Sequence, residues 1–277
     1  MRGIEHIAAV FQACRDQKRA ALMPYFTLGY PTPALSPDIV LAIAQAGADL
    51  LELGIPFSDP LADGPTIQHS TQMALEQGMS TARCLEMTAA LRRRGVAQPL
   101  LLMGYLNPIL AFGPVRFVGE AARVGADGLI VPDLPLEEAE EIEALCQRQG
   151  LALVFLASPN TPSERLARLA ERTSGFLYLT SLTGVTGARQ ALPPALSDFV
   201  ARARAVTTKP LAVGFGISTP EQARRVAAVA DGVIVGSALI EAVRQNTAPA
   251  EAAARFIAAM RLALEGNGQS SGPSRTT

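Results

Sequence analysis

The stretch Leu51-Glu-Leu-Gly-Ile-Pro-Phe-Ser-Asp-Pro-Leu-Ala-Asp-Gly-Pro-Thr-Ile-Gln-His69 begins as an apolar run and then becomes an acidic loop rich in glycine and proline. Its unusual residue is Glu52, an ionisable side chain among leucines. Burying an ionised carboxylate is costly unless a partner compensates its charge. Such a residue serves either in a structural ion pair or as an acid or base in a reaction. The local sequence leaves both interpretations open.

Apolar runs like the one around Glu52 alternate with helical segments along the whole chain. The eight runs cover residues 21–29, 49–55, 99–105, 128–131, 151–157, 176–181, 211–216 and 232–237. Such alternation is typical of parallel strands that are buried on both faces. Eight units in about 250 residues predict an α/β fold of the (β/α)₈ TIM barrel type. A doubly wound sheet is the alternative, but no G-x-G-x-x-G motif follows the first run.

The helical segments and the chain ends complete this prediction. An amphipathic helix is expected from Ile4 to Cys14, before the first run. Later helical segments are expected at 36–46, 66–94, between the third run and 124, and at 136–149, 163–172, 194–205, 219–230 and 249–264. Residues 266–277 contain no apolar side chain to anchor them. We therefore expect one barrel domain over 1–265 and a flexible tail over 266–277.

Composition limits the partners and the compartment. The 277 residues are 49% hydrophobic and 18% charged, and the net charge of -1 argues against binding to nucleic acid or anionic membranes. The three cysteines, Cys14, Cys84 and Cys146, are odd in number and widely separated, as expected of reduced thiols. Neither a signal peptide nor an apolar run of membrane-spanning length is recognisable. These features predict a cytoplasmic protein.

Polar residues collect where barrel enzymes carry their active sites, at the carboxyl ends of the strands. Glu52 lies near the end of the second run, and the loop beyond it carries Asp59 and Asp63. Two glycine-rich segments, Gly214-Phe-Gly-Ile-Ser-Thr-Pro220 and Gly236-Ser237, follow the last two runs. Barrels commonly bind phosphate in these two loops, so the pair favours a phosphorylated ligand.

The scarcity of other reactive side chains narrows the chemistry. The only lysines, Lys18 and Lys209, precede strands, which is the wrong end of a barrel for a Schiff base. The only histidines, His6 and His69, are far apart in sequence, so a zinc enzyme would lack its usual ligands. Acid/base chemistry by carboxylates on a phosphorylated small molecule is the reaction class that remains.

Several motifs together resemble a known family, the alpha subunit of tryptophan synthase. The long stretch from Leu51 to Gln68 is similar to the family signature almost residue for residue. The likeness continues in Leu102-Met-Gly-Tyr-Leu-Asn-Pro108, Gly128-Leu-Ile-Val-Pro-Asp-Leu-Pro135, Gly184-Val-Thr-Gly187, Gly214-Phe-Gly-Ile-Ser218 and Gly236-Ser237. It covers about residues 4 to 264.

The resemblance implies a carbon–carbon lyase of tryptophan biosynthesis. Its reaction would be the retro-aldol cleavage of indole-3-glycerol phosphate into indole and glyceraldehyde 3-phosphate, with no metal and no organic cofactor. A pyridoxal-phosphate beta subunit would be the partner, in an alpha2-beta2 heterotetramer. Two alternatives stay open: a stand-alone lyase that releases indole, and a mainly regulatory subunit that activates a beta partner.

The resemblance also implies roles for individual residues. Glu52 would be the general acid and base, Asp63 would hold the indole N–H, and Tyr178 would support Glu52 and the substrate. The segments 58–63 and 182–190 resemble mobile loops that close over substrate. The other substrate-binding positions would be Tyr25, Met103, Tyr105, Ile130, Thr186 and Phe215, and the phosphate-binding positions Gly187, Gly216, Gly236 and Ser237.

One position departs from the family pattern. Tyr30 stands between Gly29 and Pro31, where many members have an acidic residue. Its place at the end of the first run puts a contact to a loop or to the partner in doubt, but leaves the chemistry untouched.

Overall fold

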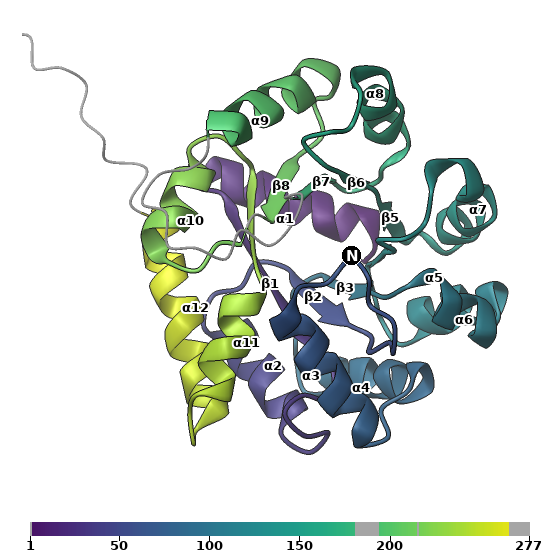
Figure 1. Cartoon of the computed structure of the whole chain (residues 1–277), viewed down its shortest axis with the longest axis vertical. Helices are drawn as coiled ribbons and strands as arrows, with labels where there is room; N and C mark the ends of the chain where they lie inside the picture. Colours follow the sequence, from purple (N-terminus) through teal and green to yellow (C-terminus); the bar gives the residue numbers. More distant parts are fainter. Residues whose placement is uncertain (1, 181–193, 215, 266–277) are drawn as a thin grey trace, which may run out of the picture.

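The computed structural model describes residues 2–180, 194–214 and 216–265. These residues form parallel strands at the centre with helices arranged around them (Figure 1). The strands are β1 Ala21–Thr27, β2 Leu51–Gly54, β3 Leu100–Met103, β4 Gly128–Ile130, β5 Ala152–Val154, β6 Leu156–Ala157, β7 Leu177–Thr180, β8 Leu211–Gly214 and β9 Gly232–Val235. The predicted TIM barrel is therefore confirmed.

The barrel closes through the chain itself. The nine strands follow the order β5-β4-β3-β2-β1-β9-β8-β7-β6, and every pair is parallel. The two strands at the ends of this order are separated by a single residue, Phe155. Its carbonyl accepts a hydrogen bond of 3.1 Å from the backbone N–H of Tyr178, so the ring continues across the break. The prediction of one unbroken strand over 151–157 was wrong, because a break at a single residue leaves the apolar pattern of the sequence unchanged.

Each predicted helical segment is present, and three of them are divided. The helices are α1 Ile4–Asp16, α2 Ser36–Gln45, α3 Pro65–Glu76, α4 Thr81–Arg93, α5 Leu106–Phe112, α6 Pro114–Arg123, α7 Glu140–Gln149, α8 Ser163–Arg172, α9 Pro194–Val206, α10 Pro220–Ala227, α11 Ser237–Arg244 and α12 Pro249–Glu265, with a 3₁₀ turn at Leu136–Glu138. The segment predicted over 66–94 breaks at Gly78, whose φ of 77° is left-handed, and restarts behind the Ser80 cap. Gly113, at φ 90°, separates α5 from α6 in the same way.

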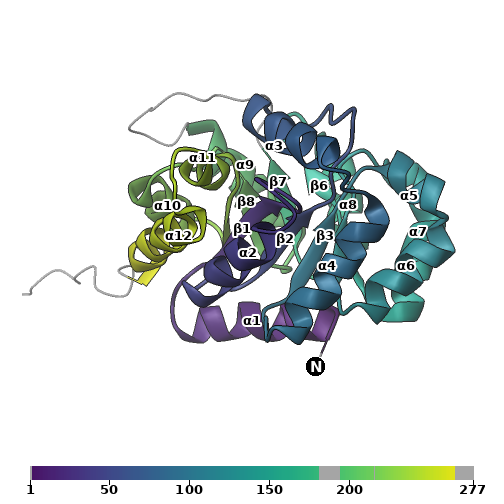
Figure 2. The ribbon, with the colours of Figure 1, turned by 90° about the horizontal axis from the view of Figure 1, so that it is seen from below.

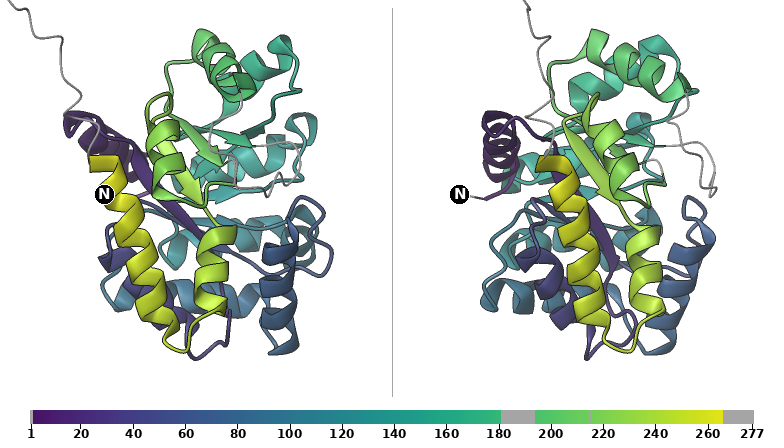
Figure 3. Two further views of the ribbon diagram at one scale, coloured as in Figure 1. Left: turned by 60° about the vertical axis from the view of Figure 1, so that its left-hand side comes forward. Right: turned by 90° about the vertical axis from the view of Figure 1, so that its left-hand side faces the viewer.

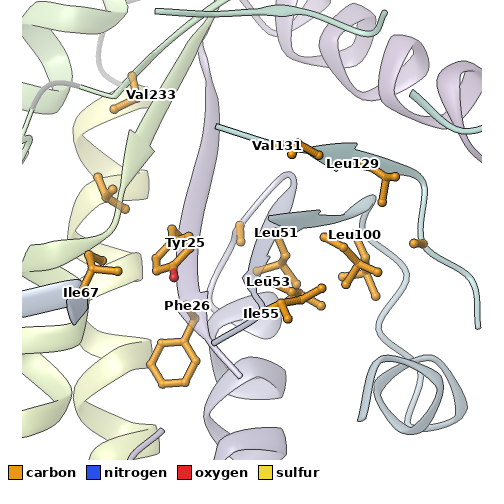
Figure 4. Close-up of a cluster of buried hydrophobic side chains, with 14 of the residues drawn as sticks. Tyr25, Phe26, Leu51, Leu53, Ile55, Ile67, Leu100, Leu129, Val131 and Val233 are labelled. Atoms are coloured by element: carbon orange, nitrogen blue, oxygen red, sulfur yellow. The ribbon is translucent and has the colours of Figure 1, made fainter. Parts of the chain in front are cut away.

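Two apolar cores hold the barrel together. The outer core lies between strands and helices and includes Leu51, Leu53 and Leu100, which group together in Figure 4. The inner core fills the barrel, and α1 closes its amino end with Ile7 and Phe11. Figures 2 and 3 show α1 lying across that end of the molecule.

The last helix completes the wall of the barrel. Helix α12 packs against α2, α10 and α11, so the end of the described chain lies beside its first strand-helix unit (Figure 1). The predicted tail, 266–277, lies outside the described residues, and the division into a barrel over 1–265 and a tail remains a prediction. No helix of the described ranges has the length and apolar character needed to cross a membrane.

A buried carboxylate ties the amino end of the barrel together. Asp127, just before β4, is fully buried and accepts hydrogen bonds from the backbone N–H groups of Gly3 (2.7 Å) and Leu100 (2.9 Å). Its other partners are the His6 ring, with Nδ1 at 3.0 Å, and the Arg92 guanidinium. One side chain thus connects α1, α4, β3 and β4.

We predict that Asp127→Ala lowers the free energy of unfolding by about 3 to 5 kcal/mol, because Arg92 and two backbone donors lose their buried acceptor. Urea unfolding of both proteins at pH 7 measures the difference. Glu120→Ala is the control, since this carboxylate pairs with Arg123 on the surface of α6 and its loss should leave stability nearly unchanged. Equal losses for the two variants would contradict the structural role of Asp127.

Candidate functional site

Glu52 points into the barrel. It lies in register with Tyr25 of β1 and Leu101 of β3, and residues in register on parallel strands share a face. Leu101 belongs to the inner core, whereas Leu51 and Leu53, on either side of Glu52 in the sequence, belong to the outer core. The alternation of a short strand thus places a carboxyl group inside an apolar barrel.

The environment of Glu52 favours its neutral form. The side chain has 0% exposure, and within the described part of the chain neither carboxyl oxygen has a hydrogen-bond partner. Burial raises the pKa of Glu52 to about 8, while the Tyr178 hydroxyl acts in the opposite direction. An ion pair would lower the pKa instead, so these surroundings do not support the structural interpretation of this residue.

Glycines make room at the carboxyl end of the barrel. A Cβ atom added to Gly54, two residues beyond Glu52 on the same face, would overlap the Tyr25 hydroxyl. A Cβ atom added to Gly214 would lie 2.9 Å from the Tyr178 hydroxyl. Both tyrosines therefore reach space that only glycine leaves free, which gives the site two phenol groups close to Glu52.

Asp63 lies at the end of the loop that follows β2. The backbone N–H of Asp63 donates to the Pro60 carbonyl (3.0 Å), and the neighbouring N–H of Ala62 donates to the Tyr105 hydroxyl (3.0 Å). The rings of Phe57 and Tyr105 lie 5.4 Å apart, so the loop rests on the end of β3. Burial raises the pKa of Asp63 to about 6, against a lowering contribution from the Tyr105 hydroxyl. Asp63 therefore loses its proton about two pH units below Glu52.

The two carboxyl groups share the same tyrosines. The pKa of Tyr25 is raised by burial first and then by the charges of Asp63 and Glu52. The pKa of Tyr178 is raised by burial and by the same two charges. Since such effects fall off with distance, Tyr25 and Tyr178 lie near both carboxyl groups. The structure thus brings together four of the predicted site residues, and Tyr105 joins them through its contact with the loop.

The other predicted positions are arranged around this group. Met103 and Ile130, at the ends of β3 and β4, pack against or within the inner core. Gly216 follows β8 with a left-handed φ of 62°, and Gly236 caps the helix that begins at Ser237. The N–H groups at the start of a helix suit an anion. The predicted residues Thr186, Gly187 and Phe215 lie outside the described residues.

Sequence reasoning missed a buried polar pair beside Tyr25. Thr27 of β1 and Ser70 of α3 each have 0% exposure, and their hydroxyl oxygens lie 2.7 Å apart. A threonine within the apolar run 21–29 was the available signal. Ser70 gave none, because a serine on a helix is usually exposed and its partner is 43 residues away.

The lysines and histidines lie away from this group. Lys18 is exposed before β1, and the Lys209 ammonium, before β8, donates to the backbone carbonyls of Glu171 and Thr173. His6 binds Asp127 at the amino end, and His69 is exposed on α3. In the ranges that the structure describes, no three His, Cys, Asp or Glu side chains are grouped so that they could hold a metal ion.

The raised pKa of Glu52 predicts a pH-dependent loss of stability. Folding raises this pKa from about 4.5 to about 8, so the cost is absent below pH 4.5, grows as pH rises, and is complete above pH 8. Glu52→Gln, which stays neutral, should be more stable than the parent at pH 9 by on the order of 3 to 5 kcal/mol and similar at pH 4. Urea unfolding across this range measures the difference. Parallel pH curves for the two proteins would show that Glu52 has an ordinary pKa.

Comparison with known proteins gives the family. The family model described as tryptophan synthase alpha chain matches residues 11–266. The tryptophan synthase alpha chain of Chloroflexus aurantiacus is 52% identical over 238 residues, covering 86% of this chain and 90% of that relative. For the alpha chain of Roseiflexus castenholzii the identity is 49%, with 94% of this chain and 99% of the relative covered.

Solved structures agree with this result. A structure of Mycobacterium tuberculosis tryptophan synthase has a TM-score of 0.88 and 35% identity, covering 96% of this chain and 99% of its own. The alpha chain from Legionella pneumophila has a TM-score of 0.87 and 36% identity, with coverages of 97% and 99%. The resemblance found in the sequence motifs is confirmed: the chain belongs to the tryptophan synthase alpha chain family.

Proposed function

We propose that Glu52 and Asp63 carry out the bond cleavage by which this chain, as a tryptophan synthase alpha chain, acts on indole-3-glycerol phosphate in tryptophan biosynthesis. The family supplies the lyase activity. The observation that supports these two residues is a pair of carboxyl groups in one site whose pKa values are raised to about 8 and about 6. Two acids in unlike environments can take opposite roles at the same pH.

Glu52 is suited to deliver a proton to carbon. Protonation of indole C3 makes the ring a leaving group for the glycerol side chain, and it requires an acid that is still protonated near neutral pH. Removal of the proton from the adjacent glycerol hydroxyl then lets the carbon–carbon bond break into indole and an aldehyde. Glu52, without a hydrogen-bond partner among the described residues, is free to serve both transfers.

Asp63 is suited to the opposite task. Its pKa of about 6 leaves it ionised at neutral pH, when most Glu52 is protonated. A carboxylate at the indole N–H would stabilise the positive charge that protonation of C3 places on the ring. Its loop, held against Tyr105, keeps this charge at the rim of the barrel rather than in its apolar interior.

The positions of the lysines support cleavage without an imine. Lys18 and Lys209 are the only lysines of the sequence, and both precede strands at the amino end of the barrel. The Lys209 ammonium is also occupied by two backbone carbonyls. We infer from these positions that the reaction uses no Schiff base. We also infer that it uses no metal, because the two histidines of the chain lie outside the site.

The loops after the last two strands are the proposed phosphate site. Gly216, Gly236 and Ser237 would offer backbone N–H groups and the start of α11 to the phosphate, together with Gly187. The substrate would then span the mouth of the barrel, with its phosphate at β8 and β9 and its ring near β2 and β3. Tyr25, Met103, Tyr105, Ile130, Tyr178, Thr186 and Phe215 are the proposed lining of the remaining space.

Exposed apolar side chains support a protein partner at the mouth. Leu61, in the loop after β2, is 93% exposed, and Leu110 of α5 is 51% exposed. The segments that carry them meet where Tyr105 holds the loop. We propose that this surface binds a tryptophan synthase beta subunit, in an alpha2-beta2 complex.

The buried thiols of Cys14, Cys84 and Cys146, none of which forms a disulfide, are in keeping with a cytoplasmic enzyme.

We predict that Glu52→Gln lowers the rate of indole release at least about 100-fold, because the amide can neither give nor take a proton. Asp63→Asn should be impaired to a similar extent, since it cannot compensate charge on the ring. The measurement is indole release from indole-3-glycerol phosphate by the purified chain, repeated with beta subunit added. Glu120→Gln, on the surface of α6, is the control. Substantial turnover by the Glu52 variant would sink the assignment.

The same assay gives a pH profile as its second arm. Activity that needs ionised Asp63 and protonated Glu52 should rise as pH passes about 6 and fall as pH passes about 8. In Asp63→Asn the rise on the acid side should disappear.

We predict that Leu61→Asp weakens the complex with a beta subunit at least about 10-fold, because a charge replaces an apolar contact at an interface. Size-exclusion chromatography and titration of the two subunits measure it. The matched control is Leu262→Asp on the outer wall at α12, where the parent side chain is 69% exposed. If the unmodified chain forms no complex yet releases indole, the stand-alone alternative is correct.

A further inference from the structure

A short chain of hydroxyl groups runs from the substrate site into the outer core. The Tyr25 hydroxyl lies 3.4 Å from Oγ1 of Thr27, and Thr27 Oγ1 lies 2.7 Å from Oγ of Ser70. Ser70 in turn donates its proton to the backbone carbonyl of Ile67 (2.8 Å). Thr27 and Ser70 have 0% exposure and Tyr25 has 8%. Buried hydroxyls of this kind have few partners from which to choose, so their proton positions can be deduced.

The Ile67 carbonyl, at the end of this series of hydroxyl groups, determines the direction of their hydrogen bonds. A carbonyl oxygen can only accept, so the single proton of Ser70 is used on Ile67. The short contact between Ser70 and Thr27 then needs the proton of Thr27, which makes Ser70 the acceptor. Thr27 has no proton left for Tyr25, and it can only accept from the phenol. The Tyr25 proton is therefore directed towards Thr27 and is not available to a ligand.

The oxygen of Tyr25 lies in the proposed substrate pocket. It occupies the space that a side chain at Gly54 would fill, and Tyr25 itself is in register with Glu52. Figure 4 shows the ring between Ile67 on one side and the residues of β2 on the other. With its proton turned towards Thr27, the oxygen presents its lone pairs to this space.

We propose that the Tyr25 hydroxyl is a hydrogen-bond acceptor for the substrate, kept in that state by Thr27 and Ser70. This inference rests on the proposed function, and it makes Tyr25 a specificity-determining residue rather than a purely apolar wall. The groups it would bind are the glycerol hydroxyls of the substrate, since the indole N–H is assigned to Asp63. Thr27 and Ser70 are positioning residues, because they act through Tyr25.

The test measures dissociation constants by calorimetry for two analogues that cannot be cleaved. One is 3-(indol-3-yl)propyl phosphate, whose ring N–H is its only neutral donor, and the other is its N-methyl derivative, which has none. Neither analogue carries the glycerol hydroxyls, so Tyr25→Phe should bind both of them as tightly as the parent does. KM for the substrate, which has these hydroxyls, should rise about 3- to 10-fold in the same variant. The proposal is overturned if KM for the substrate is unchanged or if either analogue binds more weakly.

Variants of the positioning residues test the direction of the chain. Ser70→Ala frees the proton of Thr27 to turn towards Tyr25, so it should weaken the same ligand as Tyr25→Phe does, although Ser70 lies in the outer layer. Thr27→Val should do likewise, whereas Thr27→Ser keeps the hydroxyl and should retain affinity. If Ser70→Ala and Thr27→Val both keep the parent's affinity for the substrate, the proposed role of these two residues is refuted.

Controls separate these outcomes from misfolding and from a wrong function. Tyr30→Phe removes another buried tyrosine hydroxyl, beside Arg244 and outside the barrel, and should leave binding unchanged. Thermal unfolding of every variant verifies the fold. Failure of the unmodified chain, with beta subunit, to release indole refutes the proposed function. An active parent with an unaffected Tyr25→Phe refutes only the role of Tyr25.

Discussion

The site depends on one unfavourable interaction, the burial of a carboxyl group in the apolar interior of the barrel. Glu52 is held there by the alternation of β2, whose leucines must face the outer core. The strand cannot turn Glu52 outward without turning Leu51 and Leu53 inward. The packing of the barrel thus provides the energy that keeps an acid protonated near neutral pH.

The same constraint explains the distribution of glycine and tyrosine at the mouth. Strand ends carry Gly54 and Gly214 where side chains would fill the barrel, and the hydroxyls of Tyr25 and Tyr178 enter the space. These phenols give polar contacts close to Glu52 without bringing a cation that would ionise it. The amino end is built in the opposite way, since Asp127 there accepts hydrogen bonds from several donors and so connects neighbouring elements.

Much of this arrangement could be predicted from the sequence, because it depends on local patterns. Apolar runs located the strands, and they placed Glu52 on the second strand, where it lies in register with Tyr25. The break at Phe155 gave no signal, since one residue does not change an apolar run. The pairing of Thr27 with Ser70 could not be foreseen either, because it joins a strand to a helix far along the chain. Such contacts are set by the packing of whole elements, which no short window contains.

Helix α1 affects how protons can enter and leave the interior of the barrel. With Ile7, Phe11 and Cys14 sealing the amino end, water can approach Glu52 from the mouth, and a bound substrate would occupy that route. In the proposed mechanism, the number of protons inside the occupied barrel would then stay constant during a turnover. In this mechanism, a proton placed on the ring carbon would be replaced by the one that leaves the hydroxyl, so the two transfers would balance within a single molecule of substrate. Because α1 closes the amino end of the barrel, one acid would be sufficient for both transfers. In an open site, that acid would exchange its proton with solvent.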